Sequence, residues 1–214
     1  MRILVFDTET TGLPTERNPS IFESKKWPYI VQLSYIVYDC SLNNLICLYD
    51  EVLKLPDGIE ISYESILLHK ITQEINERIG VDRREALKTF NMELQQADII
   101  IGHNISFDKR LIMVECIRNK VQQHFNYRGN KKYEYCTMKN TVDLCKIEKI
   151  GKEGDTYFKY PTLSELYFHL FNEIPKNVHN SFMDVLFCLR CYYKITYNMD
   201  LFEADGVIKT MCEK

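Results

Sequence analysis

Two carboxylates stand two residues apart, directly after an apolar run near the start of the chain. Residues 3–6 are apolar, and Asp7 and Glu9 follow them. Side chains two positions apart in a strand share a face, so a strand over residues 2–7 brings both carboxylates together. Close carboxylates resist ionising together unless a cation lies between them, and such oxygen ligands suit Mg²⁺ or Mn²⁺. The residues leave a second interpretation open, in which one carboxylate caps a turn and the other faces water.

Two more carboxylates stand at expected helix starts. Asp108 lies in the first turn of a helix expected over about 106–120, where the helix dipole favours an acid, so a simple helix-end charge also explains it. Asp184 precedes an apolar run within a helix expected over 181–197. We expect Asp184 to point into the fold or a cleft, where a buried carboxylate needs a partner such as a metal ion.

A histidine and an aromatic residue stand beside these acids. His179 lies five residues before Asp184. An imidazole titrates near neutrality and can accept a proton from water, although a single histidine is more often structural. Phe107 precedes Asp108 and could stack on a nucleobase, but packing in the core explains it at least as well.

The composition is that of one globular domain, expected to span residues 1–214. Of the 214 residues, 45% are hydrophobic, which is enough for one well-buried core. No stretch reaches the apolar length that crosses a bilayer, and the start of the chain does not read as an export signal. The eight cysteines are therefore expected to be reduced thiols in the cytoplasm or nucleus. Cys188 and Cys191 fall inside an expected helix and are interpreted as core or semi-buried thiols.

The charge is unevenly distributed along the chain. Residues 118–159 hold ten Lys/Arg and five Asp/Glu, a balance of +5 in a chain whose formal net charge is −3. A basic segment of this kind can follow a phosphate backbone, although the charge alone favours an ordinary solvated surface.

The apolar patterns predict an α/β domain with a mixed sheet. Strands are expected first, over 2–7, over 30–39 and in a run ending near residue 55 that forms a hairpin with its predecessor. A strand over 98–102 and helices over about 84–96, 106–120, 143–149, 162–172 and 181–197 follow. Hairpin strands followed by alternating strands and helices are typical of layered α/β folds.

Three motifs in order resemble the His-type DEDD 3′→5′ exonucleases, the superfamily that includes the proofreading subunit of the bacterial replicative polymerase. They are D-x-E-T-T-G-L from Asp7, H-N-x-x-F-D ending at Asp108 and H-x-x-x-x-D ending at Asp184. The histidine five residues before the last aspartate marks the His-type branch, since the Tyr-type branch has tyrosine where Asn180 stands. Residues 26–33 are also similar to stand-alone exonucleases of large DNA viruses.

The resemblance implies a ribonuclease H-like fold, a mixed sheet with helices on both faces, and release of nucleoside 5′-monophosphates from a DNA or RNA 3′ end. It implies a site for two divalent ions, Mg²⁺ or Mn²⁺. In that site Asp7 contacts both ions, Glu9 and Asp184 hold the ion that carries the attacking water, and Asp108 holds the other. His179 is the implied general base.

The resemblance also implies a substrate-binding set around the terminal nucleotide. Its members are Thr8, Thr10, Leu13, Asn104, Phe107 and Ile71. Ile71 belongs to a segment similar to the family's H-G-I-T, in which Lys70 replaces the glycine. The implied partners are a single-stranded or 3′-end nucleic acid and a polymerase or other replication protein, and no membrane is expected. Two alternatives remain: an exoribonuclease or oligoribonuclease on the same fold, and a non-cutting relative that binds nucleic acid or a polymerase.

Overall fold

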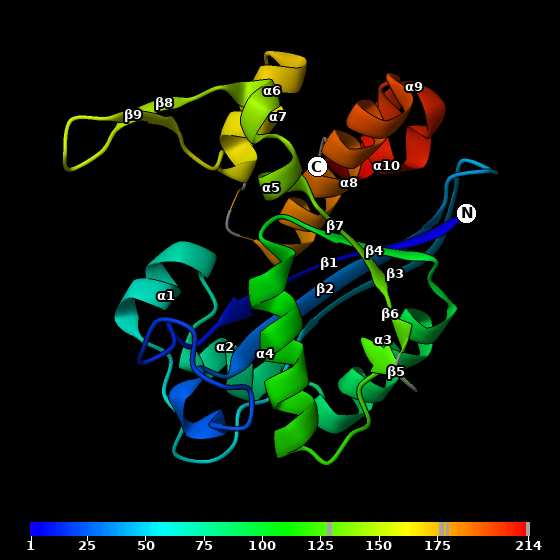
Figure 1. Cartoon of the computed structure of the whole chain (residues 1–214). Helices are drawn as coiled ribbons and strands as arrows, with labels where there is room; N and C mark the ends of the chain where they lie inside the picture. Colours follow the sequence, from blue (N-terminus) through cyan, green and yellow to red (C-terminus); the bar gives the residue numbers. More distant parts are fainter. Residues whose placement is uncertain (128–129, 176–177, 179, 213–214) are drawn as a thin grey trace.

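The computed structural model describes residues 1–127, 130–175, 178 and 180–212, which build around one five-stranded sheet (Figure 1). The strand order is β3-β2-β1-β4-β7. The strands are β1 (Arg2–Thr10), β2 (Ile30–Asp39), β3 (Asn44–Val52), β4 (Ile99–Gly102) and β7 (Tyr133–Cys136). The first three are antiparallel neighbours, whereas β4 runs parallel to β1 and to β7. The expected mixed sheet is confirmed.

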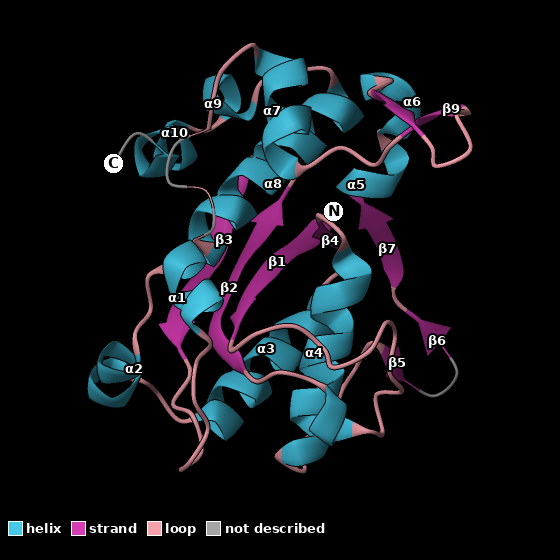
Figure 2. Cartoon of the chain, turned by 90° about the vertical axis from the view of Figure 1, so that its left-hand side faces the viewer, coloured by secondary structure: helices cyan, strands magenta, loops and turns pink. Residues whose placement is uncertain are grey.

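Helices cover both faces of this sheet, as expected (Figure 2). Leu4 and Phe6 of β1 belong to the apolar cluster under α3 (Arg83–Gln96) and α4 (Ile105–Arg118). Ile3 and Val5 belong to the cluster under α7 (Leu163–Phe171) and α8 (Ser181–Tyr197). Successive strand residues point to opposite faces, so β1 is buried on both sides and its odd-numbered residues face α8.

Smaller elements complete the fold, and one expectation among them is wrong. They are η1 (Ser24–Lys26), α1 (Tyr63–His69), α2 (Gln73–Ile79), β5 (Asn126–Tyr127), β6 (Asn130–Lys131), α5 (Thr137–Asn140), α6 (Val142–Cys145), β8 (Glu148–Ile150), β9 (Thr156–Phe158), α9 (Leu201–Ala204) and α10 (Gly206–Cys212). The helix expected over 143–149 stops at Cys145, because Lys146 takes the left-handed conformation with φ 47°. Residue 148 instead opens the β8–β9 hairpin.

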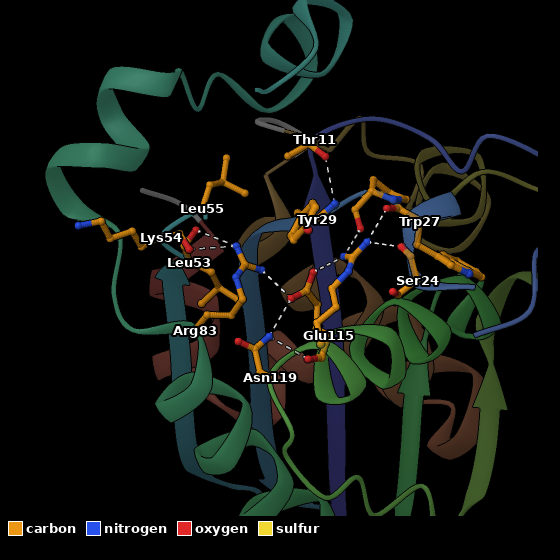
Figure 3. Close-up of polar contacts among 12 residues, drawn as sticks. Thr11, Ser24, Trp27, Tyr29, Leu53, Lys54, Leu55, Arg83, Glu115 and Asn119 are labelled. Atoms are coloured by element: carbon orange, nitrogen blue, oxygen red, sulfur yellow. Dashed lines mark hydrogen bonds and ion pairs between the residues drawn. The ribbon is translucent and has the colours of Figure 1, made fainter. Parts of the chain in front are cut away.

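A buried ionic cluster anchors the long loop between β1 and β2 (Figure 3). Glu115 of α4 is fully buried and pairs with Arg83 of α3 at 3.1 Å and with Arg118 at 2.7 Å. Arg118 also donates to the carbonyl oxygens of Trp27 and Pro28, at 2.6 and 2.8 Å. The cluster therefore joins two helices to the loop that leaves β1 beside the acidic residues.

The cysteines of α8 are free and buried, as expected for core thiols. Cys188 and Cys191 lie 3% and 0% exposed in the cluster between α8 and the sheet. In the described part of the chain, no helix has the length and apolar character needed to cross a membrane.

Candidate active site

Three of the four predicted metal ligands meet at one end of β1. Ligand oxygens of Asp7, Glu9 and Asp184 all lie within 4.8 Å of one another. β1 extends to Thr10, so both of its acids belong to the strand and point toward α8. Asp184 lies in the first turn of α8. Strand alternation and helix position together produce the cluster that the sequence predicts.

Asp108 approaches the same end of the sheet from the opposite face. Because β4 runs parallel to β1, α4 begins at the edge where β1 ends, and Asp108 lies in its first turn. Asp108 is 4% exposed, and its carboxylate accepts a 2.7 Å hydrogen bond from the Thr8 hydroxyl. Asp108 therefore lies outside the group of Asp7, Glu9 and Asp184, but it is close enough to raise the pKa values of Asp7 and Glu9.

Burial and mutual repulsion raise the pKa values of these acids. Burial raises the pKa of Asp7 well above its usual range, and the charges of Asp108, Asp184 and Glu9 raise it further. Burial, Asp184 and Asp108 raise the pKa of Glu9 to about 8. Burial raises the pKa of Asp108 to about 7, against the Thr8 hydrogen bond. These carboxylates cannot all be ionised together without a cation beside them. Their hard oxygen donors fit a divalent cation such as Mg²⁺ or Mn²⁺.

A pocket of about 610 Å³ opens beside the acids. Four residues of the predicted substrate-binding set line it: Thr8, Thr10, Leu13 and Phe107. Leu13 is 82% exposed, whereas Phe107 is half-buried against the α4 cluster with its ring 6.4 Å from that of Trp27. Phe107 thus both packs in the core and faces the pocket.

The opposite wall of this pocket was missed by sequence reasoning. It consists of Ser62, Glu64, Ser65, Leu68 and His69, at α1 and its N-cap. The available signal was Ser62, whose side chain accepts a hydrogen bond from the backbone N–H of Ser65 and caps the helix.

Side-chain contacts limit what some predicted substrate residues can offer. The Thr8 hydroxyl is bound to Asp108, and the Thr10 hydroxyl donates to the carbonyl oxygen of Gly12 at 2.7 Å. Ile71 is buried in a third apolar cluster, and Asn104 is exposed at the start of α4 with φ 64°. Their substrate roles stay predictions.

His179 lies outside the described residues, so its role as general base also stays a prediction. The structure does describe the start of the helix that follows it. The side chain of Asn180 accepts a hydrogen bond from the backbone N–H of Met183 and caps α8 one turn before Asp184.

Comparison with known proteins identifies the family of the chain. The exonuclease family model, RNase_T, matches residues 4–192. The chain belongs to this exonuclease family. A search of curated proteins found no match.

Solved exonuclease structures share the fold. E. coli Exonuclease I in complex with a dA16 oligonucleotide is similar with a TM-score of 0.65 and 18% identity, over 94% of this chain and 42% of the other. A moderately thermophilic Exonuclease I from Methylocaldum szegediense gives a TM-score of 0.64 and 17% identity, over the same shares. The chain thus spans less than half the length of these proteins.

The basic segment of this exonuclease is divided between two places. The Lys132 ammonium donates to the carbonyl oxygens of Gln95 and Ala97, at 2.9 and 2.6 Å, and Lys159 pairs with Glu165. Figures 1 and 2 show β6 and the β8–β9 hairpin at different ends of the molecule, and in Figure 2 both lie across the molecule from α1. Part of the positive charge therefore serves internal contacts rather than a surface beside the pocket.

Lys70 stands where the family motif has glycine, and its backbone takes a conformation that favours glycine. His69 accepts a hydrogen bond from the backbone N–H of Ile71 at Nδ1 (3.1 Å), and its Nε2 therefore donates to the carbonyl oxygen of Thr10 (3.3 Å). The turn between His69 and Ile71 puts Lys70 in the left-handed region with φ 64°, which favours glycine.

Lys70→Gly should therefore stabilise the exonuclease. Relief of the left-handed lysine is worth about 1 kcal/mol, which raises the midpoint of thermal unfolding by about 2–4 °C. The control is Lys88→Gly, at an exposed position inside α3, which should destabilise by about 1 kcal/mol. A fall in the Lys70→Gly midpoint equal to that of the control would contradict this account.

The acidic cluster should make the metal-free exonuclease less stable as pH rises. The folded pKa of Glu9, about 8, and that of Asp108, about 7, lie above the ordinary carboxyl range near 4. Between these values the folded state binds more protons than the unfolded state, so the free energy of unfolding falls as pH increases. We expect the unfolding midpoint in EDTA to fall from pH 5 to pH 8, and Mn²⁺ to restore it.

Glu9→Gln is the control for this pH dependence. The variant lacks one titrating group, so its midpoint in EDTA should fall less than that of the parent protein over the same pH range. Equal slopes for the two proteins would show that Glu9 does not titrate as described.

Proposed function

We propose that this exonuclease removes nucleoside 5′-monophosphates one at a time from the 3′ end of a single strand of DNA. The observation that carries the proposal is the convergence of Asp7, Glu9 and Asp184 within 4.8 Å, with Glu9 also lining a pocket. Family membership supplies the exonuclease reaction, and the acidic cluster supports its dependence on metal. The 3′→5′ direction follows from the His-type motif set.

Four carboxylates would hold two divalent ions. Asp7 is close enough to Glu9, Asp184 and Asp108 for all three charges to act on it, so it would be a ligand common to both ions. The chemistry that bound Mg²⁺ or Mn²⁺ supplies is neutralisation of the scissile phosphate and activation of water. Thr8 fixes the Asp108 carboxylate through its hydroxyl. His179 would accept the proton of the attacking water.

The pocket between Leu13, Phe107 and α1 would hold the terminal nucleotide. Its exposed leucine and aromatic ring offer apolar contact to a base of any identity. Structures of E. coli Exonuclease I contain oligonucleotides, which supports a single-stranded substrate here. RNA is the alternative substrate, and a polymerase or replication partner stays a prediction.

Digestion of matched 5′-labelled DNA and RNA oligonucleotides with Mg²⁺, Mn²⁺ or EDTA tests the function. We expect a metal-dependent ladder that shortens from the 3′ end, with mononucleotide products. Faster digestion of the RNA would assign the chain to the exoribonucleases. Retained strand binding without cleavage in either metal would contradict the proposal and indicate a non-cutting relative.

A further inference from the structure

A chain of hydrogen bonds joins α8 to β3 beside the acidic cluster. The hydroxyl oxygens of Ser181 and Ser34 lie 2.5 Å apart, and both residues are fully buried. The Ser34 hydroxyl also lies 2.6 Å from Asp50 Oδ1, and Gln32 Nε2 donates to the same oxygen at 2.7 Å. Four side chains from two strands and a helix are therefore connected, and Asp50 Oδ1 accepts from two of them.

The direction of this chain is determined by its donors and acceptors. The Asp50 carboxylate only accepts, so Ser34 must donate its single hydroxyl hydrogen to it. Ser34 then has lone pairs but no hydrogen left, and Ser181 must donate to Ser34. Hydrogen bonds that end on a charged acceptor are stronger than neutral ones. The Asp50 carboxylate thus determines the direction of both hydroxyl hydrogen bonds.

The two β2 residues of the hydrogen-bond chain, Ser34 and Gln32, lie directly opposite the acids of β1. Ser34 is the register partner of Asp7, and Gln32 is the register partner of Glu9. Opposite residues on antiparallel strands share a face, with Cβ atoms about 4.5–5.5 Å apart. A shift of Ser34 or Gln32 would therefore act directly on the strand segment that carries the two acids.

Ser181, the residue that α8 contributes to the hydrogen-bond chain, lies close before Asp184 in the helix. Ser181 is three residues before Asp184, so both point from the same side of the first turns of α8. The neighbouring residues Met183, Val185 and Leu186 make apolar contacts, which have no directional preference. The Ser181–Ser34 hydrogen bond gives this turn a directional contact with the sheet.

Asp50 can influence the site while lying outside it. Its carboxylate lines a pocket of about 480 Å³ where β3 meets the end of α1 and the start of α8, together with His69, Asn180 and Met183. Asp50 does not belong to the group of three acids that converge on the metal site. Its contacts are with the residues that hold those acids in place.

We propose that Asp50 is a positioning residue of the metal site, which holds Asp184 against Asp7 and Glu9 through Ser34, Ser181 and Gln32. The proposal rests on the proposed metal-dependent function. Loss of residues that orient metal ligands weakens metal binding by about 10–100-fold. Loss of Asp50 should therefore change metal affinity even without nucleic acid.

The test compares Asp50→Ala and Asp50→Asn with Glu51→Ala in the full chain. Glu51 is the neighbouring exposed acid, and it points to the opposite face of β3, so its replacement removes the same charge without touching the hydrogen-bond chain. Mn²⁺ affinity is measured by titration calorimetry, and kcat and KM are measured on a DNA oligonucleotide. We expect Asp50→Ala to bind Mn²⁺ about 10-fold more weakly and to lower kcat more than it changes the substrate KM. Asp50→Asn keeps an acceptor oxygen and should retain most of the Mn²⁺ affinity and most of kcat.

Mn²⁺ affinity and kcat of Asp50→Ala within twofold of Glu51→Ala would overturn the proposal. If Asp50→Ala does not fold, Ser34→Ala, Ser181→Ala and their double variant replace it. Their effects on Mn²⁺ affinity should be non-additive, and strict additivity would overturn the proposal. Absence of Mn²⁺ binding and hydrolysis in the unmodified protein would instead contradict the proposed function, so the two failures are distinguishable.

Discussion

Asp7→Asn should abolish hydrolysis and at the same time stabilise the metal-free protein. Asp7 is the acid whose pKa all three other carboxylates raise, so it is central to the cluster. Asparagine keeps the shape but removes one negative charge and one metal ligand. We expect kcat to fall by at least about a thousandfold, because the electrostatic groups of an active site typically contribute this much. In EDTA near pH 8, the unfolding midpoint should rise, because one source of repulsion among the acids is gone.

The opposite signs of these two effects separate a functional residue from a structural one. A residue needed only for folding would lose activity and stability together. The matched control is Asp57→Asn, at an exposed turn position, which should leave both quantities unchanged. Wild-type turnover by Asp7→Asn would show that the acidic cluster is not the site of hydrolysis.

The parts of the site that sequence reasoning located depend on local patterns. The spacing of Asp7 and Glu9 after an apolar run determines which face they share, and the helix expected over 181–197 matches α8 in full. Asp108 likewise follows from a strand that leads directly into a helix. In each case the residues that determine the local structure lie within a few positions of the functional side chain.

The parts that were missed depend on contacts between distant segments. Asp50 meets Ser34 across a hairpin, and Ser34 in turn meets Ser181, which lies 147 residues further along the chain. Neither contact has a local signature, because a single serine or aspartate within a strand has the pattern of an ordinary polar residue. The α1 wall of the pocket was missed for a different reason: α1 has seven residues, too few for a clear helical period.

The lysine turn in the same region shows the limit of motif matching. Lys70 departs from the family's glycine, yet its left-handed backbone keeps the turn that the motif specifies. The hydrogen bonds of His69 on both sides of that turn fix its geometry. The departure therefore changes the free energy of the turn rather than its shape.

Glu115→Ala should destabilise the protein more than any other single change considered. It leaves Arg83 and Arg118, both largely buried, without their shared anion, and burial already lowers the pKa of Arg83. Removal of one partner from a buried ionic cluster costs about 3–5 kcal/mol. In a chain of this size the unfolding midpoint should fall by roughly 6–20 °C. Urea unfolding followed by circular dichroism measures the loss directly.

Glu85→Ala provides the contrast, because Glu85 forms an exposed pair with Lys88 on α3. Exposed pairs of this kind contribute about 0.3–0.5 kcal/mol, so this variant should unfold close to the parent protein. Since Arg118 also binds the carbonyl oxygens of Trp27 and Pro28, loss of Glu115 should loosen the loop that carries Leu13 before the sheet unfolds. Proteolysis of the folded variant should then cut first within residues 12–26. Equal unfolding free energies for Glu115→Ala and Glu85→Ala would mean that the two arginines find other partners, and that the buried cluster is not what fixes this loop.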